Sequence, residues 1–82
     1  MTSLFGLKFD IFCIMKFAAV LKDLRTEKEL SQKQLSQKTG ISQSAIAKWE
    51  LAKSEPSARA LIILADFFNV TIEQLLGLEE LR

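Results

Sequence analysis

Histidine and tyrosine are absent from this chain of 82 residues, and cysteine occurs only once, as Cys13. The lack of histidine removes the usual general base and the commonest zinc ligand, and one cysteine cannot form an internal disulfide. Without clustered carboxylates, the chain also cannot assemble a nucleophile, a base and an orienting group. We therefore expect no enzyme activity, no metal site and no cofactor, and the cysteine usage favours a reducing cytoplasm.

A long uninterrupted apolar run is missing as well. The most apolar stretch, from Leu4 to Met15, contains Lys8 and Asp10, whereas a helix that spans a bilayer needs about 18 or more apolar residues. A signal peptide would need basic residues before the apolar stretch and a small-residue cleavage site after it, and neither is convincing here. We expect no membrane partner and a cytoplasmic location.

The charges are unevenly distributed, although the net charge is only +1. Residues 16–59 carry nine basic and five acidic side chains, whereas residues 60–82 carry one basic and four acidic side chains. The first part is therefore suited to face phosphates and the last part to face away from them, unless these are ordinary solvated charges.

Apolar residues recur three and four positions apart from residue 16 onward, which is typical of helices with one buried face. Capping boxes at Ser31 and Thr71 mark two helix starts, and Gly40 marks a helix end. With glycine and proline scarce and room for only one core, we expect a single all-α domain. Its five helices are expected at about residues 16–28, 31–39, 43–51, 57–68 and 71–76.

The second and third of these helices meet at a very tight turn around Gly40, with Leu35 and Ile46 at inward positions. This spacing is typical of a helix-turn-helix, in which the third helix enters the major groove of DNA, although a plain helical hairpin has the same pattern. Trp49 shares the inward register of Ile46, which favours a core position over stacking on a base.

The run LSQKQLSQKTGISQSAIAKWE, from Leu30 to Glu50, resembles the Cro and repressor (XRE) family of helix-turn-helix regulators. The resemblance extends from Phe17 to Leu76 and implies a five-helix, lambda-repressor-like DNA-binding domain. We place this domain at residues 16–82, preceded by an amino-terminal apolar extension, residues 1–15. The specific matches are Arg25, Leu30-Ser31-Gln32, Gly40, Ser42-Gln43-Ser44, Trp49-Glu50, Pro56 and Leu64-Ala65.

The resemblance also implies roles for individual residues. Gln43 would bind adenine through N6 and N7 while Gln32 holds its amide in place, and Lys48 would favour guanine or contact a phosphate. Arg25 and Glu50 would form a buried ion pair. The expected base-contacting residues are Gln43, Ser44 and Lys48, and the residues expected to contact phosphate or to orient others are Gln32, Lys33, Ser42, Lys53 and Arg59.

Three positions depart from the family: Ser36, where alanine is usual, Leu51, which cannot donate to a phosphate, and Ala52, where glycine is usual. The change at Ser36 is expected to be harmless, because serine is nearly as small as the alanine that is usual there. An alanine in a left-handed cap costs about 1 kcal/mol, so the backbone contacts after the third helix are in doubt.

The chain is thus expected to be a transcriptional regulator, by preference a repressor, that binds double-stranded DNA as a homodimer on a palindromic operator. An antitoxin-like module that binds a protein toxin and its own operator is the alternative. For the dimer interface, the favoured candidate is the apolar carboxy-terminal end with Leu78 and Leu81. The other candidate is the stretch from Leu4 to Ile14, which could pair as a strand across the dimer or extend the first helix. A third interpretation is that this stretch is a disordered leader and that the native protein starts at Met15.

Overall fold

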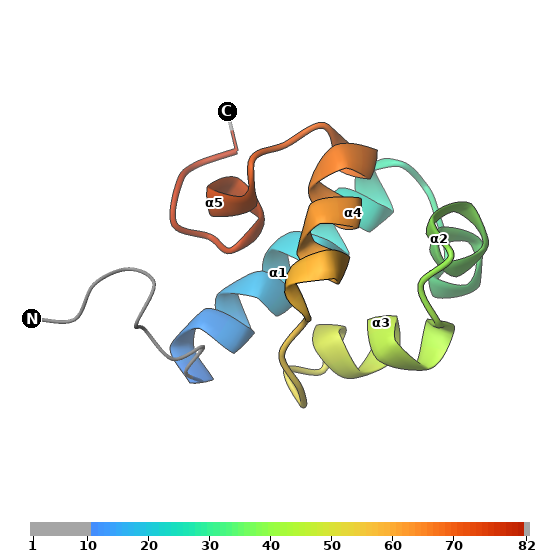
Figure 1. Ribbon diagram of the computed structural model, residues 1–82, viewed down its shortest axis with the longest axis horizontal. Helices are drawn as coiled ribbons and strands as arrows, with labels where there is room; N and C mark the ends of the chain where they lie inside the picture. The colour runs from blue at the N-terminus through green and yellow to red at the C-terminus, as the bar shows by residue number, and fades with distance from the viewer. Residues whose placement is uncertain (1–10, 82) are drawn as a thin grey trace, which may run out of the picture.

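Five helices and no strand make up the described part of the chain, residues 11–81, in a computed structural model (Figure 1). This confirms the expected all-α fold. The helices are α1 (Ile11–Glu27), α2 (Gln32–Thr39), α3 (Gln43–Glu50), α4 (Ala58–Phe68) and α5 (Ile72–Leu75). None of these described helices has the length and apolarity that a membrane span requires.

Helix α1 begins at Ile11, five residues before the expected start at Lys16. The half-buried Cys13 and Ile14 lie one turn before the buried Phe17 and Ala18, so the face that packs on the core continues into this first part. Of the two conformations considered for the stretch from Leu4 to Ile14, the extension of the first helix is therefore confirmed for residues 11–14, and the strand is wrong there. The remainder of that stretch lies outside the described residues.

One core joins all five helices. Its largest fully buried side chains come from α1, α2, α3, α4 and α5 in turn, and Trp49 packs against Phe17 with 5.9 Å between the ring centroids. Around this core, Val20 and Leu61 are half-buried and Ile72 is exposed. The fully buried set is Phe17, Leu21, Leu35, Ile46, Leu64 and Leu75.

Three helices end on a residue other than glycine in the left-handed conformation: Glu29, Ala52 and Asn69, each with φ of 58°. After α3, the backbone N–H of Lys53 donates to the carbonyl of Lys48 at 2.9 Å, and the N–H of Ala52 donates to the carbonyl of Trp49 at 3.0 Å. This pair of bonds is the Schellman motif, in which glycine normally occupies the position of Ala52.

The variant Ala52→Gly is therefore expected to raise the free energy of unfolding by about 0.5–1 kcal/mol, because glycine removes the cost of a Cβ in this conformation. Urea unfolding followed by the fluorescence of Trp49 measures the change. The matched control is Ala19→Gly at an exposed site inside α1, where glycine should instead cost about 0.5–1 kcal/mol. A loss of stability in both variants would contradict the strain at Ala52.

Candidate nucleic-acid interface

Helices α2 and α3 pack against each other across a turn of three residues. Gly40 adopts φ of 80° and donates its N–H to the carbonyl of Ser36 at 2.8 Å, which ends α2. The hydroxyl of Thr39 then accepts the N–H of Ile41 at 3.2 Å, and Ser42 caps α3 by accepting the N–H of Ala45 at 3.1 Å. These short bonds fix the angle between the two helices. The hydrogen bond from Ile41 to the Thr39 hydroxyl was not expected from the sequence.

Helix α3 turns one face into the core and the other outward. Ile46 and Trp49 are buried, the latter at 6% exposure, so the expected core position of the tryptophan is confirmed. Gln43, Ser44 and Lys48 are all exposed. A polar, short-chained surface on a firmly anchored helix is suited to approach the base edges in a major groove.

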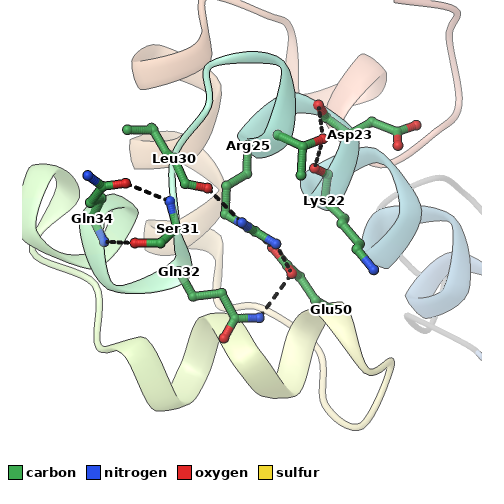
Figure 2. A network of polar contacts seen from close by, with 9 residues as sticks. Lys22, Asp23, Arg25, Leu30, Ser31, Gln32, Gln34 and Glu50 are labelled. Atoms are coloured by element: carbon green, nitrogen blue, oxygen red, sulfur yellow. Dashed lines mark hydrogen bonds and ion pairs between the residues drawn. The ribbon is translucent and has the colours of Figure 1, made fainter.

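The Arg25 guanidinium and the Glu50 carboxylate form two hydrogen bonds, Nε to Oε2 at 2.7 Å and Nη2 to Oε1 at 2.9 Å (Figure 2). A third donor, Nη1, reaches the carbonyl of Leu30 at 2.6 Å. The two side chains are only 11% and 5% exposed, so the pair expected between these residues is an ion pair removed from water. Its hydrogen bonds to Glu50 raise the pKa of Arg25, while burial opposes this shift. The pair ties the end of α1 and the start of α2 to the end of α3.

Gln32, the first residue of α2, has a different partner from the one that the family resemblance implied. Its amide Nε2 donates to Oε1 of Glu50 at 3.0 Å, and no bond joins it to Gln43 within the described residues (Figure 2). A bond to a carboxylate is stronger than a bond between two amides, which explains the preference in the absence of DNA. The sequence offered no signal for this bond, because the two residues are 18 positions apart.

The basic residues proposed near phosphates lie around α2 and α3. Lys33 is in the first turn of α2, Lys53 lies in the loop three residues after the end of α3, and Arg59 is in the first turn of α4; all three are exposed. None of them has an acidic partner within residues 11–81. Leu51, directly after α3, is 65% exposed, and its side chain has no hydrogen-bond donor. Between residues 11 and 81 no group of three metal-ligating side chains occurs.

Comparisons with known proteins agree with this geometry. A helix-turn-helix family model matches residues 21–75. The chain is 45% identical over 67 residues to the HTH-type transcriptional activator BcrR of Enterococcus faecalis, covering 82% of this chain and 33% of that protein. It is 38% identical over 60 residues to the HTH-type transcriptional regulator AnsR of Bacillus subtilis, covering 73% of this chain and 52% of that protein.

The chain thus spans between a third and about half the length of these curated relatives. No solved structure matches it. The family match includes both helices of the turn, the buried ion pair and the outward face of α3. The chain belongs to the XRE-type helix-turn-helix family of DNA-binding transcriptional regulators.

Proposed function

We propose that this protein recognises a specific double-stranded DNA site by placing α3 in the major groove. The observation that carries the proposal is the division of α3 between a buried face, with Ile46 and Trp49, and an exposed polar face. The buried face and the Glu50 ion pair hold the helix rigidly, so the exposed side chains are presented in one orientation. The protein would act in the cytoplasm as a regulator and not as an enzyme.

The exposed side chains have the chemistry for direct readout. The amide of Gln43 matches adenine N6 and N7, the ammonium of Lys48 matches guanine O6 and N7, and the Ser44 hydroxyl can contact either purine. We assign phosphate contacts to the exposed Lys33, Lys53 and Arg59, and to the backbone N–H groups at the start of α2. The protein would repress by occupying a promoter; a reporter gene behind the bound site distinguishes this from activation.

The variant Gln43→Ala is expected to weaken binding to the preferred duplex by about 1–3 kcal/mol, because a bidentate contact to one base is lost. Binding to a scrambled duplex should hardly change. Fluorescence anisotropy with both duplexes at several salt concentrations measures the two affinities.

Lys53→Ala is the matched control, since a phosphate contact carries no sequence information. It should weaken both duplexes alike and lower the slope of log affinity against log salt by about 1. Equal losses on both duplexes for Gln43→Ala would refute base readout by this residue, and an unchanged slope for Lys53→Ala would place that lysine in solvent.

The proposed DNA-binding unit is a homodimer. One helix contacts only about four base pairs, too few to define a site in a genome, whereas two copies would bind half-sites about 10 base pairs and 34 Å apart on a palindrome. Leu78 and Leu81 are 51% and 40% exposed, and their segment lies on the opposite side of the molecule from α3 (Figure 1). A second copy bound there would leave α3 open to DNA.

The double variant Leu78→Glu/Leu81→Glu is expected to weaken self-association by at least about 3 kcal/mol, because each leucine buried in an interface contributes about 1.5–3 kcal/mol. Analytical ultracentrifugation with and without operator DNA measures it. Ile62→Glu, at an exposed residue of leucine size on α4, is the control. Loss of the dimer only in Phe12→Glu/Met15→Glu would move the interface to the start of α1, where both residues are exposed.

A further inference from the structure

Leu51, the residue directly after α3, is a large apolar side chain on a polar surface. It is 65% exposed, and among the described residues 16–61 no other large hydrophobic side chain is exposed. Ser44 and Lys48, one and two turns before it, are polar and exposed, and Lys53 follows in the loop. Leu51 is thus a single apolar group within a polar surface and not part of an apolar patch that a partner protein would cover.

The position of Leu51 is set by the geometry of α3. Its backbone N–H donates to the carbonyl of Ala47 at 3.1 Å, as the N–H of a further helical residue would, and the chain turns away only at the left-handed Ala52. Ser44, Lys48 and Leu51 are four and three positions apart, so they share one face of the helix. Leu51 therefore lies on the same face as two side chains that we propose to contact bases.

A phosphate contact is not open to Leu51. Its side chain has no polar atom, and its backbone N–H is already bonded within α3. The side chain nevertheless loses water if α3 enters a major groove. Burial against a base edge that offers only polar groups would remove those groups from water without a hydrogen bond, which costs free energy. An apolar group on the DNA is the favourable neighbour for this leucine.

We propose that Leu51 is a further specificity-determining residue, which contacts the C5-methyl group of a thymine in the major groove. This inference rests on the proposed placement of α3 in that groove. Thymine carries the only methyl group that the four bases present there, and the other groups are hydrogen-bond donors and acceptors. Contact between the leucine and this methyl group removes two apolar surfaces from water, so Leu51 favours thymine at one position of the site.

The test replaces thymine by uracil, which removes only the C5-methyl group. The probes are the preferred duplex, selected from random duplexes with the full chain, and the same duplex with uracil at each thymine in turn. We expect uracil to raise the dissociation constant by about 3- to 5-fold at one thymine position, the effect of one buried methyl group. With Leu51→Ala, the dissociation constants of the thymine and uracil duplexes should be equal at this position.

Three further variants sharpen the comparison. Leu51→Asn has a side chain of similar size but polar, and it should also lose the difference between thymine and uracil. Leu51→Met keeps a long apolar side chain and should retain the difference. Ile62→Ala, at an exposed apolar residue of α4, is the matched control and should leave the difference unchanged. Because each ratio compares two duplexes with the same protein, changes in folding or self-association cancel.

A preferred duplex in which no thymine responds to uracil would overturn the proposal. A response that persists in Leu51→Ala, or one that is lost in Leu51→Met or Ile62→Ala, would overturn it as well. If selection yields no preferred duplex, the proposed recognition of a specific DNA site itself fails. The two failures are therefore distinguishable.

Discussion

Replacement of Arg25 by alanine is expected to lower the free energy of unfolding by about 3–5 kcal/mol, because it leaves the carboxylate of Glu50 buried without a counter-charge. The guanidinium also holds the carbonyl of Leu30 at 2.6 Å, so the loop between α1 and α2 loses its anchor as well. Urea unfolding followed by Trp49 fluorescence measures the loss. Lys22→Ala, at an exposed position of the same helix, should change stability by less than about 0.5 kcal/mol.

The double variant Arg25→Met/Glu50→Leu separates the penalty of an orphaned charge from the worth of the pair. Desolvation offsets most of the attraction in a buried pair, so two apolar side chains of similar size should restore most of the lost stability. A double variant as unstable as Arg25→Ala would show that the pair itself stabilises the fold.

High pH should not release this pair within the range that proteins tolerate. The hydrogen bonds to Glu50 raise the pKa of the Arg25 guanidinium above its ordinary value. A group with a raised pKa stabilises the fold fully below its unfolded pKa and loses that contribution only as the pH rises through the folded pKa. The guanidinium therefore stays charged under all ordinary conditions.

Most of the fold could be predicted from the sequence because local rules and tertiary packing agree. The capping box at Ser31, the left-handed Gly40 and the inward Leu35 all appear as expected. The start of α1 was not placed correctly, since the resemblance to the family begins only after the apolar residues that precede Lys16. The left-handed Glu29 was also missed, because glutamate carries no signal for that conformation.

The exposure of the residues proposed to contact bases could be predicted, but the hydrogen bonds around them could not. The exposed positions of Gln43, Ser44 and Lys48 follow from helical periodicity alone, and these three side chains keep their proposed roles in DNA contact. The bond between Gln32 and Glu50 depends on how α2 and α3 cross, which no local pattern encodes. Ser42, proposed near phosphate, has its side-chain oxygen engaged in capping α3.

Replacement of Trp49 by alanine is expected to cost about 3–5 kcal/mol of stability, as is usual for a large aromatic side chain in a core. Trp49 is 6% exposed, and its ring meets that of Phe17 edge to face, with 5.9 Å between the centroids and 61° between the planes. This contact is part of the packing of α3 on α1. Because the chain has no other tryptophan and no tyrosine, circular dichroism is the suitable measurement.

Trp49→Leu distinguishes an anchor in the core from a residue that stacks on a base. Leucine keeps an apolar side chain in the core but has no aromatic ring, so it should recover part of the stability lost in Trp49→Ala. If the ring only anchors α3, the affinity of folded Trp49→Leu for duplex DNA should equal that of the unmodified protein. A fall in affinity that remains after correction for the folded fraction would mean that the indole contacts DNA, and the buried position of this side chain argues against that result.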